Sequence, residues 1–120
     1  MKYMLLIYGN EDIWSSFPAD EFADVIRETE ALHAELRETG ELVGSYGVAD
    51  QVMAKTVRVR DGIPAVTDGP YLEAKEYLGS FTIVDCDSLD RALEIAGRNP
   101  ASRFVQVEVR PIMHESAPEG

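Results

Sequence analysis

The first clear pattern along the chain is at residues 3–8, YMLLIY, which are apolar at consecutive positions rather than at alternate ones. A strand of this kind is covered on both faces of its sheet. Residues 18–39 then carry apolar side chains at helical spacing, with Pro18 suited to the first turn and Gly40 to the stop. The polar segment between them, which contains Trp14, is expected to be a loop.

The remaining pattern predicts further strands, a hairpin and a second helix. Apolar runs indicate strands or a hairpin at residues 41–48, 55–69, 77–85 and 103–111. Asp61-Gly62, in the middle of the hairpin, is a strong two-residue turn signal. Asp87 and Asp90 form an acidic variant of the capping box, which begins the second helix, and residues 70–76 are expected to form a short helical turn.

Each helix has an apolar stripe that is expected to face the core. The stripes comprise Phe22, Val25, Ile26, Leu32 and Leu36 in the long helix and Leu89, Ala92, Leu93 and Ala96 in the second. Thr29 and His33 fall on the first of these stripes, one turn apart. Because buried polar groups need hydrogen-bond partners, we expect both to contact something polar, such as a pocket wall. His33 is either a semi-buried histidine with satisfied hydrogen bonds or a general base.

The elements follow the order β-α-β, a β-hairpin, and β-α-β, which is the ferredoxin-like split βαβ pattern. We therefore predict an α+β fold with one domain, residues 1–113, and a frayed tail at residues 114–120. The two helices cover one face of an antiparallel sheet and leave the other open. Because the first strand is apolar on both sides, a second copy is expected to cover that face, forming a homodimer with a shared α/β barrel.

The composition excludes several classes of function. The net charge of −11 argues against binding to nucleic acids or to anionic membranes. The apolar runs are too short for a secretory signal or a membrane span, and the single Cys cannot form an internal disulfide, so a cytoplasmic protein is expected. Two His residues and scattered carboxylates predict no metal site, and without a phosphate-binding loop no cofactor is expected.

Residues 67–81, TDGPYLEAKEYLGSF, contain the main candidate for chemistry. Asp68 precedes Gly-Pro, where it either accepts a hydrogen bond from its own turn or serves as a pocket carboxylate. Tyr71 is either a core or rim aromatic residue or a pocket residue. Lys75 is either a solvated charge or a partner of Asp68 or of an anionic ligand. Trp14 either caps a pocket or packs against the start of the long helix.

Four segments resemble the YCII-related proteins, in particular their DGPF subfamily: MKYMLLIYG, VRVRDG, TDGPYLEAKEYLGSF and VEVRPIM, in order across residues 1–113. The resemblance implies a ferredoxin-like dimeric α+β barrel. Members are often encoded beside extracytoplasmic-function sigma factors, a few relatives have lyase-like or dehydrochlorinase activity, and a His–Asp pair has been suggested as their acid–base machinery. Here Tyr71 replaces the Phe of the signature. Thr29, which cannot titrate near neutrality, stands where many relatives carry His.

Two functions of different class follow from these observations. In the first, the protein binds a small molecule, with Asp68 as the candidate for acid–base catalysis. The ligand-binding candidates are Thr29, His33, Tyr71, Lys75 and Trp14. In the second, it is a non-catalytic accessory or sensor protein that acts through a protein partner, with a link to extracytoplasmic-function sigma factor signalling. Retention of Asp68 favours the first, and the absence of the family's His favours the second.

Overall fold

The computed structural model, which describes residues 1–116 and 118, shows the predicted alternation of strands and helices. The strands are β1 (Lys2–Gly9), β2 (Leu42–Gly47), β3 (Lys55–Arg60), β4 (Ile63–Asp68), β5 (Tyr77–Asp85) and β6 (Val107–Pro111). The helices are α1 (Glu11–Ser15), α2 (Ala19–Thr39) and α3 (Leu89–Arg98), with the 3₁₀ helices η1 (Gln51–Met53) and η2 (Pro100–Arg103).

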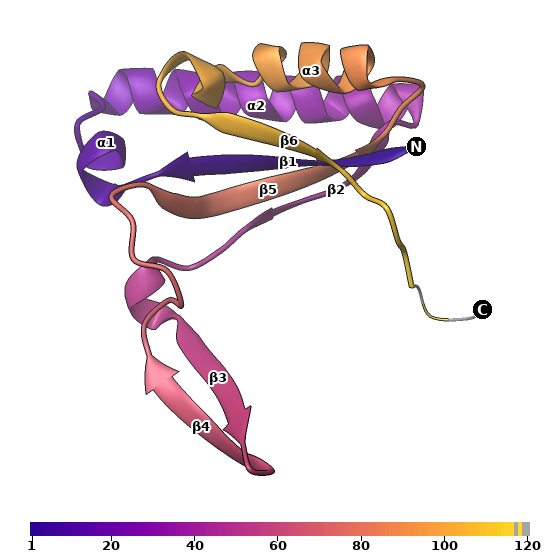
Figure 1. Cartoon of the computed structure of the whole chain (residues 1–120). Coiled ribbons are helices and arrows are strands. Elements are labelled where there is room, and N and C mark those ends of the chain that lie inside the picture. Colours follow the sequence, from indigo (N-terminus) through magenta and orange to yellow (C-terminus); the bar gives the residue numbers. More distant parts are fainter. Residues whose placement is uncertain (117, 119–120) are drawn as a thin grey trace.

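Four of the strands form one antiparallel sheet in the order β2-β5-β1-β6. In this order β5 lies between β1 and β2, and β1 lies between β5 and β6. Each β-α-β unit therefore has one strand of the other unit between its own two strands, which is the split βαβ arrangement. The helices α2 and α3 both lie over the same face of the sheet (Figure 1). The predicted α+β, ferredoxin-like fold of the chain is therefore confirmed.

The core lies between this sheet and the helices. Side chains of β1 alternate between buried and half-buried positions, and the buried ones face the helices. Tyr3 and Leu5 of β1 pack there with Val84 of β5, Leu36 of α2 and Ile95 of α3. The half-buried side chains of β1 face the opposite side, where the described residues place no helix over the sheet.

The apolar stripe of α2 is buried only in the C-terminal half of the helix. Leu32 and Leu36 are buried, whereas Phe22 and Ile26 are 43% and 45% exposed. A helix of this length extends roughly 32 Å, and a strand as long as β1 only roughly 27 Å, so the sheet is too short to cover all of it. The prediction of a fully core-facing stripe is thus wrong for the first turns.

The buried side of α3 also differs from the predicted stripe. Ala92, Ile95 and Ala96 are buried, but Leu89 and Leu93 are 46% and 50% exposed. The buried side is therefore shifted around the helix towards Ile95, a residue that the predicted stripe left out.

Several local predictions are corrected by the structure. The expected loop before α2 contains the short helix α1. The N-cap of this helix is Asn10, whose Oδ1 atom accepts a hydrogen bond from the backbone N–H of Ile13, with a distance of 2.8 Å between oxygen and nitrogen. Residues 70–76 contain no helical turn. The N-cap of α3 is Ser88 rather than Asp87, and the Ser88 hydroxyl accepts a hydrogen bond from the backbone N–H of Arg91.

The C-terminal part of the chain begins its last strand later than predicted. η2 occupies part of the segment before it, so β6 starts at Val107. Beyond β6, the N–H of Ile112 donates to the carbonyl of Lys2 at 2.9 Å, and the Lys2 side chain pairs with Glu115. Of the predicted tail, residues 117, 119 and 120 lie outside the described part of the chain. No helix among the described residues is both long and apolar enough to cross a membrane.

The strands β3 and β4 form a separate hairpin that projects from the sheet on the side away from the helices (Figure 1). Asp61 and Gly62 both have positive φ, at 49° and 75°, which is the conformation of the predicted two-residue hairpin turn. Val57, Val59 and Val66 of the hairpin are each at least 60% exposed. Isolated two-stranded hairpins are marginally stable in water, so this arm has little packing of its own.

Candidate ligand-binding site

Two hollows lie at the junction between the hairpin and the sheet. The larger has a volume of about 680 Å³ and the smaller of about 310 Å³, both within the usual range for small-molecule sites. The larger is lined by residues that include Asp50, Gln51, Asp68, Gly69, Glu73 and Lys75. The smaller is lined by residues that include Glu11, Trp14, Val48, Asp50, Tyr77 and Leu78. Asp50 borders both.

Asp68, the last residue of β4, lines the larger hollow with an exposed carboxylate. That carboxylate forms an ion pair with Lys55, which lies directly opposite on β3. The turn after it is closed by other groups, since the N–H of Gly69 donates to the carbonyl of Ala54 at 2.8 Å and the hydroxyl of Thr56 donates to the carbonyl of Gly69 at 2.8 Å. The carboxylate is thus held by a lysine rather than by its own turn.

Lys75 and Tyr71 lie on the segment that follows Asp68. Lys75 lines the same hollow, and its backbone carbonyl accepts a hydrogen bond from the side-chain amide of Asn10 at 3.0 Å. The lysine that pairs with Asp68 is Lys55 instead. Tyr71 is 82% exposed and lines a different hollow, beside Arg58 on the hairpin. The structure therefore brings Asp68 and Lys75 to one cavity and places Tyr71 outside it.

Asp50 and Tyr77 form a contact that links the two hollows. Tyr77 donates its hydroxyl to Oδ2 of Asp50 at 2.7 Å, and Oδ1 of Asp50 accepts the N–H of Val52 at 3.0 Å. These hydrogen bonds, led by that from Val52, lower the pKa of Asp50. The hydrogen bond to Asp50 is also the main reason why the pKa of Tyr77 is raised. At neutral pH the pair therefore consists of a carboxylate and a neutral phenol.

Trp14 belongs to α1 and lines the smaller hollow. It also stacks on Phe17, with the ring centroids 6.2 Å apart. Both interpretations drawn from the sequence are therefore compatible with its position, because one side chain can border the hollow and pack near the start of α2.

Thr29 and His33 lie on α2 and are not among the residues around the two hollows. The hydroxyl of Thr29 donates to the carbonyl of Val25 at 2.7 Å, one turn earlier in the same helix. His33 is half-buried, and its pKa is lowered mainly by burial and secondarily by Arg37, against an opposing effect of Glu30. A lowered pKa keeps the imidazole neutral at physiological pH. Their role in ligand binding remains a prediction.

Sequence comparison places the chain in a family. The YCII-related domain matches residues 1–116, which is nearly the whole chain. The chain belongs to the YCII-related family. An uncharacterised protein from Rhizobium meliloti (strain 1021) is 34% identical over 116 residues, which cover 93% of this chain and 92% of the relative.

A solved structure resembles this YCII-related chain over 96% of the length of both. It is 5-chloro-2-hydroxyhydroquinone dehydrochlorinase (TftG) from Burkholderia phenoliruptrix AC1100, in complex with 2,5-dihydroxybenzoquinone. The TM-score is 0.50 and the sequence identity is 15%. At that identity the likeness shows a shared fold.

Sequence reasoning missed three residues at this candidate site. Lys55 could have been found, because a two-residue turn at Asp61-Gly62 sets a register in which Lys55 faces Asp68. Asp50 and Gln51 carry no such signal, because they lie in an irregular connection whose path depends on the whole fold. Among residues 1–116 and 118, no three His, Cys, Asp or Glu side chains are grouped to hold a metal ion.

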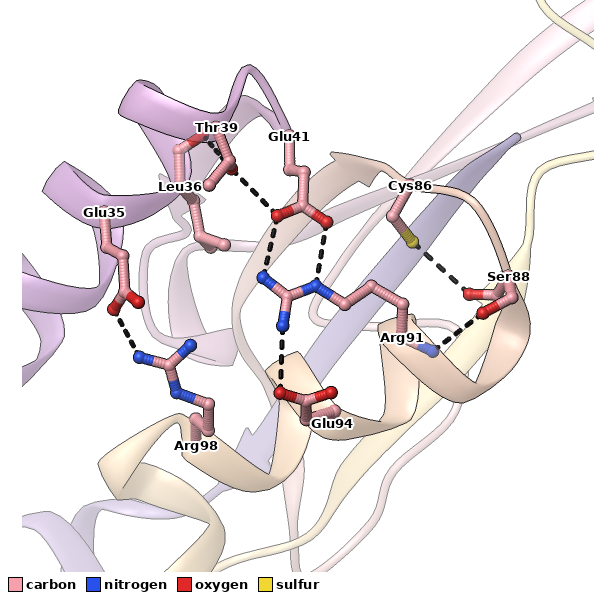
Figure 2. A network of polar contacts seen from close by, with 9 residues as sticks. All are labelled: Glu35, Leu36, Thr39, Glu41, Cys86, Ser88, Arg91, Glu94 and Arg98. Carbon is pink, nitrogen blue, oxygen red and sulfur yellow. Dashed lines mark hydrogen bonds and ion pairs between the residues drawn. The ribbon is translucent and has the colours of Figure 1, made fainter.

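A second polar cluster of the YCII-related chain lies away from the hollows, at the C-terminal end of α2 (Figure 2). Arg91 donates from Nε to Oε2 of Glu41 at 2.9 Å and from Nη2 to Oε1 at 2.8 Å, and it also contacts Glu94. The hydrogen bond from Arg91 is the main reason why the pKa of Glu41 is lowered to about 2. With both groups paired to each other, we assign this cluster a structural role.

Proposed function

We propose that this YCII-related protein binds a small organic molecule in the larger hollow, with Asp68 as a proton acceptor in lyase-like chemistry. The observation that carries the proposal is the position of Asp68, which has an exposed carboxylate on the wall of a hollow of about 680 Å³. A carboxylate used only as a turn cap would instead be hydrogen-bonded to its own backbone.

The charges around Asp68 fit acid–base chemistry on such a ligand. Lys55 contacts the carboxylate, and Lys75 lines the same hollow. A lyase-like elimination needs a base that takes a proton from the substrate and a positive charge near the atom that gains electron density. Asp68 can supply the first, and the two lysines can supply the second.

The proposal can be tested with 5-chloro-2-hydroxyhydroquinone, which the name of the structurally similar dehydrochlorinase supplies as a first probe. Binding is measured by saturation-transfer NMR in the absence of oxygen, and turnover by the release of chloride. We expect Asp68→Asn to weaken binding or abolish turnover, because the amide lacks both the charge and the proton-accepting capacity.

Asp61→Asn is the matched control for this substitution. Asp61 is also a hairpin aspartate, but it lies in the turn at the far end of the arm, and Asn is well tolerated at its positive φ. Asp61→Asn should therefore bind and react like the unchanged protein. Equal binding and turnover by the Asp68→Asn and unchanged proteins would contradict the proposal.

A second candidate function is a non-catalytic accessory or sensor role through a protein partner, including a link to sigma factor signalling. It is favoured by the apolar residues exposed on the hairpin, Val57, Val59 and Val66. It is also favoured by Thr29 at the position where the family resemblance leads us to expect His. For either function we place the protein in the cytoplasm, where the free thiol of Cys86 stays reduced.

A further inference from the structure

Asp50 holds a fixed carboxylate at the boundary between the two hollows. It is the N-cap of η1, and its two oxygens accept one hydrogen bond each, from the N–H of Val52 and the hydroxyl of Tyr77. A carboxylate has about four acceptor positions, so each oxygen can accept a further hydrogen bond. The side chain therefore combines a defined orientation with unused acceptor capacity beside both hollows.

Gln51, the next residue, also lines the larger hollow. Its Oε1 atom is buried and accepts no hydrogen bond from residues 1–116 and 118. A buried acceptor without a donor is unfavourable, and such groups in folded proteins are generally satisfied by a partner. The atom is closed to solvent, so a donor group on a bound molecule supplies that partner once the side chain turns its amide oxygen into the hollow.

The smaller hollow has an apolar wall that includes Trp14, Val48 and Leu78. The indole of Trp14 lies so close to Gly9 that a Cβ there would come within 2.6 Å of its Cζ2 atom. Glycine at this point of β1 thus allows the ring to lie against the strand. The close contact and the stacking on Phe17 restrict the ring, so the wall is largely preformed.

We propose that the two hollows form one ligand site in which Asp50 and Gln51 accept hydrogen bonds from a hydroxyl or amino group of the ligand. Tyr77 is a positioning residue that orients Asp50 for this contact. The ligand is a neutral or cationic ring compound whose apolar part lies against Trp14. The inference rests on the proposed function and adds the class of ligand and the residues that select it.

The charges near Asp50 favour this class of ligand over a carboxylate. Glu11 lines the smaller hollow beside Asp50, and Glu73 lines the larger one. An anionic group placed beside Asp50 would be repelled by these carboxylates, whereas a hydroxyl or ammonium group would donate to them. Of the positive charges of the site, Lys75 lines the larger hollow with Asp68, and Lys55 is paired to the Asp68 carboxylate.

Three probes that share one ring test the selectivity: phenol, benzylamine and benzoate. Trp14 is the only tryptophan of the chain, so its indole N–H gives a single NMR signal. We expect phenol and benzylamine, at millimolar concentration, to shift this signal and the side-chain amide signals of Gln51. Benzoate should bind more weakly by about tenfold or more.

Two conservative substitutions test the residues. Asp50→Asn keeps an oxygen for the N–H of Val52 but loses the charge, and Tyr77→Phe keeps the ring but loses the hydroxyl. Each should weaken binding of benzylamine by about tenfold, since charge-assisted hydrogen bonds are the strong ones. Tyr46→Phe, which removes a hydroxyl on β2 outside both hollows, is the matched control and should bind like the unchanged protein.

The pH dependence separates positioning by Tyr77 from a structural role. Removing its hydroxyl raises the pKa of Asp50, so the loss of phenol binding on acidification should begin at higher pH in Tyr77→Phe. The other charged groups around the two hollows, Glu11, Asp68, Glu73 and Lys75, are the same in both proteins. If Tyr77 only filled space, the pH at which half of the phenol binding is lost would be the same in both proteins.

Several results would overturn the inference. The first is a benzoate affinity equal to that of phenol and benzylamine. The second is an unchanged Trp14 indole signal with every probe. The third is an unchanged affinity for benzylamine in both Asp50→Asn and Tyr77→Phe. If Asp68→Asn alone lost the binding of 5-chloro-2-hydroxyhydroquinone, the proposed function would stand and the role of Asp50 and Tyr77 would be refuted. If the Asp50 and Tyr77 variants lost binding of the probes while Asp68→Asn bound and turned over 5-chloro-2-hydroxyhydroquinone like the unchanged protein, the proposed role of Asp68 would fail instead.

Discussion

At the scale of single residues, Glu41 and Arg91 show how a surface charge pair gains strength when it is shielded. Their side chains are only 16% and 26% exposed, the lowest pair of values among the ion pairs of the described residues. The guanidinium makes two parallel hydrogen bonds to the carboxylate (Figure 2). Such paired, charge-assisted contacts are stronger and more directional than single exposed ones.

We expect Glu41→Gln to lower the free energy of unfolding by about 1–2 kcal/mol, because it leaves a partly buried guanidinium without its carboxylate. The measurement is urea denaturation at neutral pH. Glu94→Gln is the matched control, since Glu94 contacts the same arginine but is 60% exposed. Its effect should stay within about 0.5 kcal/mol. Equal losses in the two variants would show that shielding of Glu41 is unimportant.

The lowered pKa of Glu41 also predicts a pH dependence of stability. Its folded pKa of about 2 lies below the ordinary value of 4.5, so the unfolded chain binds this proton more readily. The stabilisation is complete above pH 4.5 and is lost as the pH falls towards 2. The stability difference between the unchanged protein and Glu41→Gln should therefore shrink over this interval. A difference that is constant from pH 5 to pH 2 would refute the assignment.

At the scale of elements, two glycines show that the same residue type can serve different purposes. Gly40 ends α2 with a φ of 78°, and the N–H of the next residue, Glu41, donates to the carbonyl of Leu36 at 2.9 Å. Gly97 lies in α3, and apart from its chain neighbours and the backbone of its own helix no atom lies within 4 Å of the place where a Cβ would be. The first glycine is required by its backbone conformation, and the second is not.

Gly40→Ala should destabilise the protein by about 1 kcal/mol, because a Cβ is strained in the left-handed conformation. Gly97→Ala should instead stabilise it by about 0.5 kcal/mol, since alanine is the better helix former and there is space for it. Thermal denaturation of both variants gives the comparison. Shifts of the same sign would contradict the conformational explanation.

At the scale of the whole molecule, one face of the sheet carries half-buried apolar side chains that no helix of the described residues covers. Met4 and Leu6 of β1 and their β5 partners Ile83 and Phe81 are half-buried and lie on the face opposite to the helices. The radius of gyration, 16.6 Å, also exceeds the value of about 14 Å typical of a compact chain of this length, because the hairpin projects. We propose that a second copy covers this face and contacts the hairpin.

Sedimentation equilibrium should give about twice the monomer mass of 13.3 kDa at micromolar concentration. Dimers of this kind bury on the order of 1,500 Å² or more. Ile83→Arg should shift the equilibrium to the monomer, because it puts a charge at the centre of the proposed interface. Leu93→Arg, at an exposed apolar position on the helix side, is the control and should leave the mass unchanged. A monomer for the unchanged protein would exclude the dimer.

The sequence by itself determined the order and type of the main elements. Hydrophobic periodicity is a local property, so β5 appears at the predicted residues, Tyr77–Asp85, and the Asp61-Gly62 turn has the predicted conformation. The split βαβ order then leaves few possible topologies for a four-stranded sheet. The sequence also located Asp68 near the end of the hairpin and Lys75 on the segment that follows it.

Only the tertiary structure decided which side chains meet. Asp50 and Tyr77 are 27 positions apart, and Glu41 and Arg91 are 50 apart. It also decided that Tyr71 borders a different hollow from Asp68, and that Phe22 and Leu93 remain exposed. Contacts of this kind depend on strand register, on the length of a helix relative to its sheet and on the path of irregular segments. None of these leaves a periodic signal in the chain, because each is set by how distant segments pack together.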